Sequence, residues 1–280
     1  MFKRFAACLV LALLLLSSAC GEEALRGYTK ADGYVYVTLG RYMQSIDGGV
    51  PEENKNTWRW SNQKIKDTST VEIQTEPILW RVLTVDEEKA YLLSEYILFA
   101  RPLHTNVTQY KTIGTDFGQT QLCAYLNGEF ADTAFTEDEL AMLLERETFG
   151  KVFLLNSTDI KNKDYGLGNG SGSYNGMRGW GTEYAIRVTG LFVYRTKTGS
   201  HSPYWVSDQS TADKRHGRCT KATGQLGHIV SDRDNEGVRP AVWLNMDSFE
   251  ITAGTGTKTD PYVLAAKQLQ GTNGLILIPQ

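Results

Sequence analysis

The feature that most constrains this chain is its amino terminus, where two basic residues precede an apolar run and a few small residues. Lys3 and Arg4 form the basic part, and residues 5–16 form the apolar part. About a dozen apolar residues are too few to cross a hydrocarbon core roughly 30 Å thick as a stable helix. The pattern is typical of a secretory signal, and it predicts that the rest of the chain folds outside the cytoplasm.

The signal ends on Leu-Ser-Ser-Ala-Cys, and ordinary signal cleavage does not need a thiol at that place. The segment resembles a bacterial lipobox, except that Leu16 stands one place early and Ser17 occupies the usual leucine position. The resemblance implies that residues 1–19 are removed and that Cys20 carries diacylglycerol, which anchors the protein in the outer, extracytoplasmic face of the cell membrane. The alternative is a signal cut elsewhere and an incidental cysteine.

Composition predicts a folded and mildly acidic body. Loss of Lys3 and Arg4 with the signal takes the formal net charge from −3 to −5. That charge argues against nucleic acid as a partner and against electrostatic docking on anionic lipid. The hydrophobic content of 41% is enough for a core, and no second long apolar stretch occurs. We predict a lipidated tether over 20–32, a single extracytoplasmic domain over 33–266 and a tail over 267–280.

Two cysteines remain once the signal has left and Cys20 is acylated. They are Cys123 and Cys219, in a compartment where disulfides persist. A bridge between them would close a loop of nearly a hundred residues. The chain-entropy estimate for such a loop is roughly 4 to 5 kcal/mol. The alternative is one buried and one exposed thiol. The cysteines and the four scattered histidines have no zinc-ligand spacing.

The pattern along the chain predicts an α+β fold with irregular antiparallel strands and two short helices. One helix follows Leu122, Leu126 and Phe130, and the second begins at a capping box of Thr136 and Glu139. Apolar and β-branched runs predict strands over 34–39, 78–83, 90–94, 151–155, 184–188, 191–194, 204–207 and 238–244. The second and third of these strands are expected to form a hairpin. Polar or glycine-rich composition predicts long exposed loops over 47–75 and 162–181.

Three segments, taken in order, resemble a known family. They are 37–42 with 77–83, then 125–135 with the capped helix, and finally Gly-Val-Arg-Pro-Ala-Val-Trp-Leu at 237–244. Together they resemble an uncharacterised extracytoplasmic domain that is common in lipoproteins and cell-wall proteins of Gram-positive bacteria. The Gly-Val-Arg-Pro-Ala strand is also similar to the last strand of sulfatase-modifying (formylglycine-generating) and C-type-lectin-like folds. That similarity implies a fold of this kind and does not transfer an activity.

One acidic segment resembles the start of a calcium loop. Asp232, Asp234 and Glu236 place oxygens at loop positions one, three and five, and Gly237 stands at position six. Position twelve is Trp243, where a bidentate glutamate is needed, so an EF-hand is excluded and only a partial, weaker calcium site remains. The alternative is a charged hairpin turn before the final strand. We predict no other metal and no cofactor.

Support for catalysis is weak, and we assign no catalytic residue. The chain has no Gly-x-Ser-x-Gly elbow. One hypothesis is a Cys219 nucleophile with His216 or His228 as its base. Another is an enzyme of the sulfatase-modifying type, in which Cys123 and Cys219 would have to be reduced, adjacent and reachable from solvent.

Aromatic residues in polar surroundings favour a binding function instead. A flat ring stacks on the CH face of a sugar, while amides and carboxylates bind its hydroxyl groups. On this basis we expect a ligand to be bound by Trp180, Tyr204, Tyr174 and Asp208. The sequence therefore predicts a non-catalytic binding or scaffolding module, with a glycan or cell-wall polymer as the favoured ligand. The third alternative is a purely structural component of an envelope complex.

Other large side chains are expected in the core rather than at a site. The tryptophans in strand-like runs are Trp80, Trp205 and Trp243, and their size and setting predict burial. Arg239, which precedes a proline in the closing strand, is expected to be buried or half-buried and to bond loop carbonyl groups.

Overall fold

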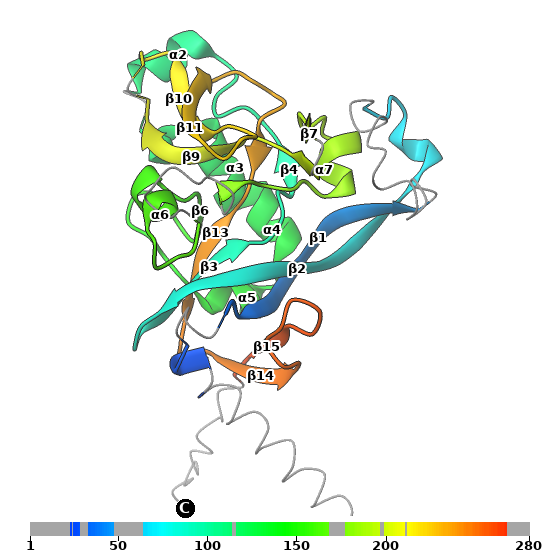
Figure 1. Cartoon of the computed structure of the whole chain (residues 1–280), viewed down its shortest axis with the longest axis vertical. Helices are drawn as coiled ribbons and strands as arrows, with labels where there is room; N and C mark the ends of the chain where they lie inside the picture. Colours follow the sequence, from blue (N-terminus) through cyan, green and yellow to red (C-terminus); the bar gives the residue numbers. More distant parts are fainter. Residues whose placement is uncertain are drawn as a thin grey trace, which may run out of the picture.

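Two mixed β-sheets with short helices on their flanks form an α+β fold, as the sequence predicted (Figure 1). The computed structural model describes residues 23, 25–28, 33–47, 64–113, 116–167, 177–196, 199–210 and 212–267. Cys20, Trp58, Trp60 and Tyr174 lie outside the described residues, as does the tail beyond residue 267.

The larger sheet contains eight strands and runs through the middle of the molecule. Its order is β14 (Phe249–Ala253), β15 (Tyr262–Ala266), β1 (Tyr36–Asp47), β2 (Glu72–Val85), β3 (Lys89–Ser94), β13 (Ala241–Asn245) and β5 (Leu143–Leu144), and β6 (Val152–Phe153) also pairs with β13. All of these pairings are antiparallel except that of β1 with β15. The predicted hairpin is β2–β3, and the Asp86 carboxylate closes its turn by accepting hydrogen bonds from the Glu88 and Lys89 backbone N–H groups.

The smaller sheet lies at the upper end of the molecule in Figure 1. Its order is β11 (Leu226–Val230), β10 (His216–Thr220), β9 (Tyr204–Gln209), β12 (Gly237–Val238) and β4 (Phe99–Ala100). A separate two-stranded ribbon consists of β7 (Tyr194–Thr196) and β8 (Gly199–His201). The closing Gly-Val-Arg-Pro-Ala segment connects the two sheets. Its first two residues form β12 in the smaller sheet, Arg239 and Pro240 follow, and Ala241 begins β13 in the larger sheet.

The described helices are short. The α-helices are α2 (Val107–Thr112), α3 (Gln121–Tyr125), α4 (Ala131–Ala134), α5 (Glu137–Ala141), α6 (Ser157–Lys161) and α7 (Glu183–Arg187). The 3₁₀ turns are η4 (Thr68–Thr70) and η5 (Phe117–Gln119), and η6 (Leu126–Phe130) is a π-helical segment. Among the described residues, no helix has both the length and the apolar character needed to span a bilayer.

The two predicted helices are present with changes that have local causes. The first is divided into α3, η6 and α4 because Gly128 leaves helical geometry, with φ −121° and ψ −106°. The second is α5, and its predicted capping box is confirmed, since Thr136 and Glu139 each bond the other's backbone N–H. Leu143 and Leu144 do not continue this helix; they form β5 and pair with β13.

The strand predicted over 184–188 is wrong, because this segment forms α7. The Thr182 side chain accepts a hydrogen bond from the Ala185 N–H and so caps the first turn. Ala185 and Ile186 are buried on one face of the helix. A short apolar run fits a buried strand and a buried helix equally well, and here the N-cap decides the outcome.

One hydrophobic cluster joins the two sheets. Trp80 and Trp205 are fully buried in it, and Trp243 packs half-buried against it. Trp80 Nε1 donates a hydrogen bond to the Leu39 carbonyl, so its one polar atom is satisfied. Arg239 is buried and its Nε donates to the Ser94 carbonyl at 2.7 Å, as the sequence predicted.

Part of the segment predicted as a tether over 20–32 packs against the folded body. Leu25 is completely buried in the hydrophobic cluster. Arg26 fixes the same turn from outside, because its guanidinium donates to the Met246 carbonyl and to the Asp247 carboxylate. Residues 25–28 are therefore part of the folded body, and in Figure 1 they lie at its lower end, close to β14 and β15.

Candidate functional site

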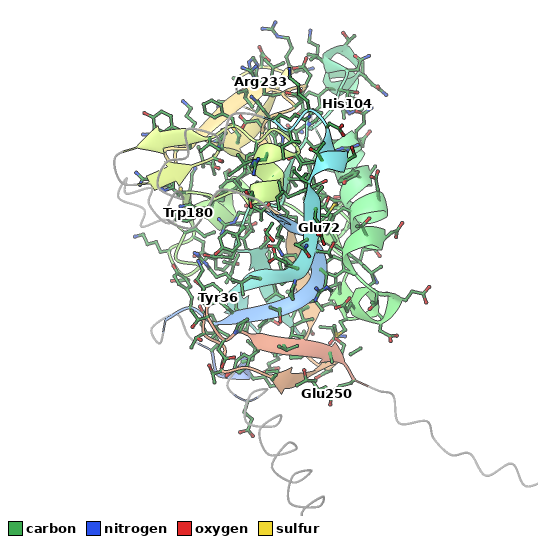
Figure 2. The ribbon with its side chains drawn as sticks, turned by 90° about the vertical axis from the view of Figure 1, so that its right-hand side faces the viewer. Tyr36, Glu72, His104, Trp180, Arg233 and Glu250 are labelled. Atoms are coloured by element: carbon green, nitrogen blue, oxygen red, sulfur yellow. The ribbon has the colours of Figure 1, made fainter. Side chains whose placement is uncertain are left out.

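The candidate site is a pocket of about 590 Å³ between the larger sheet and the segment that leads into α7. We call it the Trp180 pocket. The residues that matter most for its chemistry are Tyr36, Arg81, Glu95, Tyr96, Trp180 and Lys258. They come from β1, β2, the segment after β3, the segment before α7 and the β14–β15 loop. Figure 2 shows Tyr36 and Trp180 on the same side of the molecule.

Trp180 presents an exposed ring on a fixed backbone. Its side chain is 41% exposed, and the ring packs against His201 with 5.1 Å between ring centroids. The Trp180 carbonyl accepts a hydrogen bond from the Ile97 N–H, and the neighbouring Gly179 pairs with Ser202. A side chain at position 179 would collide with the Tyr204 ring, so glycine permits this close approach. The exposed ring therefore stands on a hydrogen-bonded backbone and packs against a neighbouring ring.

Glu95 is the centre of a buried charge cluster at the base of the pocket. Its side chain is 2% exposed. Arg81 donates to Oε2 from Nε at 2.9 Å and from Nη2 at 2.7 Å, and Lys258 Nζ donates to Oε1 at 2.6 Å. Burial raises the pKa of the Glu95 carboxyl, but Arg81, Arg239 and Lys258 outweigh burial and the net shift is downward. Glu95 is therefore a carboxylate at neutral pH.

The cluster carries more positive than negative charge. Three cations, Arg81, Arg239 and Lys258, surround the single carboxylate of Glu95. Arg239 Nη2 lies 3.8 Å from Glu95 Oε2, and neither Nη atom of Arg239 has a hydrogen-bond partner among the described residues. The Lys258 side chain is 45% exposed, and its ammonium lies 5.2 Å from the centre of the Tyr96 ring. The pocket therefore presents a cation beside aromatic rings.

Of the three described residues among those expected to bind a ligand, Trp180 lines this pocket and Tyr204 and Asp208 do not. Tyr204 is buried, and its hydroxyl donates to the Met177 carbonyl, so it supports the Trp180 segment from beneath and cannot stack on a ligand. Asp208 lies on β9, where its carboxylate accepts a hydrogen bond from the Ser157 N–H at the start of α6. Tyr174 lies outside the described residues.

Neither arrangement expected for the two cysteines is present. Cys123 and Cys219 are both free and both buried, so there is neither a bridge between them nor an exposed thiol. Cys123 lies on α3 and donates to the Phe149 carbonyl, whereas Cys219 lies on β10. Burial raises the pKa of Cys123 to about 11 and that of Cys219 to about 12. At neutral pH both are thiols, and the thiolate is the reactive form of cysteine.

The partial calcium site is also not formed. Asp232 and Asp234 are exposed in a turn, whereas Glu236 is buried where the chain enters β12. The carboxyl groups therefore do not converge on one point. In the described part of the chain, no three His, Cys, Asp or Glu side chains are grouped so that they could hold a metal ion. The alternative, a charged turn before the closing strands, describes this segment.

Sequence reasoning missed Arg81, Glu95 and Lys258. Glu95 and Lys258 are 163 positions apart, and only the pairing of β15 with β1 brings the β14–β15 loop to the pocket. The one local signal was Glu95 itself, a lone acid between two apolar runs, because a buried acid needs a cationic partner.

No protein-family model matches this chain, and neither a curated protein nor a solved structure matches it. The family resemblance and the sulfatase-modifying or C-type-lectin-like fold therefore remain predictions from the sequence.

Proposed function

We propose that this protein is a non-catalytic binding module of the cell envelope, anchored through a lipid on Cys20. In this proposal the Trp180 pocket binds a glycan or cell-wall polymer that carries negative charge. The observation that supports it most directly is the exposed, fixed ring of Trp180 in a pocket with the accessible ammonium of Lys258.

The aromatic walls favour a sugar. Trp180 offers a flat apolar face, and Tyr96 lies half-buried in the same pocket. A pyranose ring has an apolar CH face that stacks on such a surface, and its hydroxyl groups remain free for polar partners. Because hydrogen bonds hold the Trp180 backbone, little conformational entropy is lost when the ring is covered.

The charges favour an anionic ligand. Glu95 neutralises only part of the positive charge of Arg81, Arg239 and Lys258. A carboxylate or phosphate on the ligand would compensate the remainder by a charge-assisted hydrogen bond with Lys258. The protein as a whole is mildly acidic, so this pocket is a local positive site that selects an anion by position rather than by general attraction.

Binding of matched acidic and neutral oligosaccharides to the full chain in detergent tests this function. We expect the acidic member of each pair to bind more tightly, and we expect Trp180→Ala to reduce its affinity at least tenfold because the stacking surface is removed. Phe192→Ala is the matched control, since Phe192 is exposed to a similar extent (45%) and does not line this pocket.

A separate variant tests how much the charge of Lys258 contributes to ligand affinity. Lys258→Gln is expected to weaken binding of the acidic oligosaccharide and to reduce its dependence on salt, while leaving the neutral one unaffected. Lys214→Gln, at an exposed lysine outside the pocket, controls for the change in net charge. Equal binding of both oligosaccharides by the wild type, or full binding by Trp180→Ala, would contradict the proposal.

A further inference from the structure

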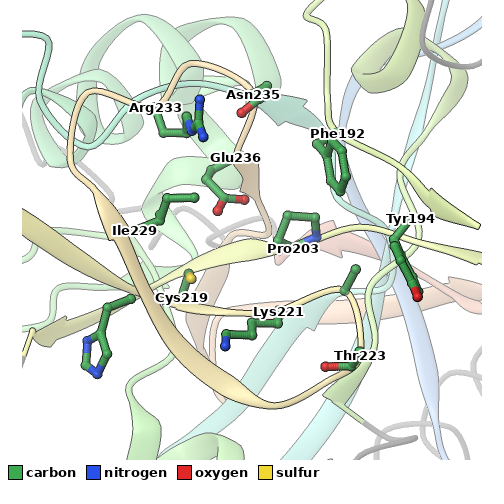
Figure 3. Close-up of a pocket in the computed structure, with 12 residues that line it drawn as sticks. Phe192, Tyr194, Pro203, Cys219, Lys221, Thr223, Ile229, Arg233, Asn235 and Glu236 are labelled. Carbon is green, nitrogen blue, oxygen red and sulfur yellow. The ribbon is translucent and has the colours of Figure 1, made fainter. Parts of the chain in front are cut away.

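A second pocket, of about 410 Å³, lies on the smaller sheet against the β10–β11 hairpin (Figure 3). We call it the Glu236 pocket. Its chemistry depends on Phe192, Tyr194, Cys219, Lys221, Arg233 and Glu236. Residues 192–194 separate it from the Trp180 pocket, because Val193 lines that pocket while Phe192 and Tyr194 line this one. The two pockets are therefore neighbours with different walls.

Glu236 lies at the floor of this pocket with an unsatisfied oxygen. The residue is 2% exposed, and its Oε2 has no hydrogen-bond partner among the described residues. Figure 3 shows its carboxyl group directed into the space above Cys219 and Pro203. A buried carboxyl oxygen without a partner costs free energy in the folded state. A ligand that donates a hydrogen bond to this oxygen would recover that free energy.

The mouth of the pocket is aromatic. Phe192 is 45% exposed and Tyr194 is 47% exposed, which makes them two of the four large hydrophobic side chains most exposed in the described part of the chain. Pro203, Ala222 and Ile229 continue the apolar wall inwards. This wall fits an apolar side chain, and the aromatic faces at the mouth are also compatible with a cation.

Two cations complete the pocket. Lys221 and Arg233 are exposed, and neither forms an ion pair with another described side chain. The other titratable groups that line the pocket are Tyr194, Cys219 and His228. Burial holds the pKa of the Cys219 thiol at about 12, and burial with the nearby Arg218 lowers the pKa of His228, so both are neutral at neutral pH. The pocket thus has an acid at its floor and bases at its rim.

We propose that the Glu236 pocket binds a short peptide with a free amino terminus and an apolar first side chain. The ligand ammonium donates to Glu236, its carboxylate lies near Lys221 or Arg233, and its apolar side chain packs on Phe192 and Tyr194. A peptide carries these three groups on one short backbone. A neutral sugar lacks the charges, and a hydrocarbon chain would leave Glu236 without a donor. The volume lies within the range of small-molecule sites.

Calorimetric titration of the full chain with a set of dipeptides that have Leu, Phe or Val first and Ala second tests this site. We expect at least one free dipeptide to bind, and its N-acetyl form to bind at least tenfold more weakly because the ammonium is lost. Glu236→Gln should reduce the affinity to a similar extent. Phe192→Ala, at an exposed position that leaves the core intact, should also weaken binding, whereas Trp180→Ala should not.

The pH dependence separates an ammonium ligand from a neutral one. Burial raises the pKa of Glu236 to about 7, against the opposing effect of Arg233. An ammonium ligand requires the carboxylate, so its affinity should rise about tenfold or more between pH 5.5 and pH 8. Failure of every dipeptide, full binding by the N-acetyl form, or an affinity that falls with pH would overturn the proposal. Oligosaccharide binding by Glu236→Gln should remain unchanged. The proposals for the Trp180 pocket and the Glu236 pocket are therefore tested independently of each other.

Discussion

Glu95 and Glu236 are both buried carboxyl groups, and their surroundings shift their pKa values in opposite directions. Three cations surround Glu95 and lower its pKa despite burial. Glu236 has only Arg233 to oppose burial, and its pKa rises to about 7. At the residue scale, the number of cations within reach decides whether a buried acid is a structural anion or a group that titrates near neutrality.

This difference predicts how stability depends on pH. Because Glu236 has a pKa of about 7 when folded and an ordinary value of 4.5, the folded state keeps its proton between these values while the unfolded state loses it. The stability contribution of Glu236 is therefore present below about pH 4.5 and is lost as the pH rises to about 7. Glu236→Gln removes this loss, so relative to wild type its free energy of unfolding should rise by about 2–3 kcal/mol between pH 4.5 and pH 8.

Urea denaturation of both proteins at the two pH values measures that difference. The comparison within each pH cancels the titration of other groups, including Glu95. A variant that differs from wild type by the same amount at both pH values would show that Glu236 does not titrate in this range.

The elements that the sequence predicted best are those whose signals are local. The β2–β3 hairpin follows from two apolar runs and a polar turn, and α5 follows from the capping box of Thr136 and Glu139. Local signals could not predict the Trp180 pocket. Strand pairing brings Arg81, Glu95 and Lys258 together, and Glu95 and Lys258 are far apart in the sequence. Polar neighbours in sequence likewise gave no indication that Tyr204 points into the core.

Glu139 links two elements, which makes it more important than an ordinary cap. Its Oε2 accepts from the Thr136 N–H at 2.8 Å, and its Oε1 accepts from the Gly40 N–H at 3.0 Å. Gly40 has a positive φ of +68° at an irregular point of β1, where a side chain would collide with Ala134 and Phe135. One carboxylate therefore fixes the start of α5 and the irregular point of β1.

We expect Thr136→Ala to destabilise the protein by about 1 kcal/mol, as for other lost N-caps. Glu139→Ala should reduce the free energy of unfolding by more than Thr136→Ala does, because it also leaves the Gly40 N–H without its acceptor. Asp138→Ala, at an exposed position in the same turn, is the matched control and should change stability by about 0.5 kcal/mol or less. Thermal denaturation of the three variants ranks them. A Glu139→Ala variant no less stable than Asp138→Ala would contradict this account.

At the scale of the whole molecule, residues 25–28, which precede β1, are part of the folded body. Leu25 is buried within the cluster that joins both sheets, and Arg26 binds the segment that follows β13. The turn at residues 25–28 therefore packs against the lower end of the folded body in Figure 1.

Leu25→Ala should reduce the free energy of unfolding by about 3 kcal/mol, as expected for a buried leucine replaced in a packed core. Val263→Ala is a suitable control, because Val263 is a large hydrophobic residue that is 40% exposed and should contribute much less. Urea denaturation gives both values. A Leu25→Ala variant as stable as Val263→Ala would mean that the amino-terminal turn contributes little to the folded body.

The burial of Leu25 would also limit how far a lipid on Cys20 lets the protein extend from a membrane. If Cys20 carries the proposed lipid, only five residue steps separate the acylated residue from the folded body. Five fully extended steps would reach about 18 Å, and the span is shorter because Glu23 is helical and its carbonyl accepts a hydrogen bond from the Gly27 N–H. The protein would stay close to the bilayer surface, with the end near β14 and β15 facing the lipid headgroups. It would then meet only those ligands that come near the membrane, and it would not explore the depth of a cell wall.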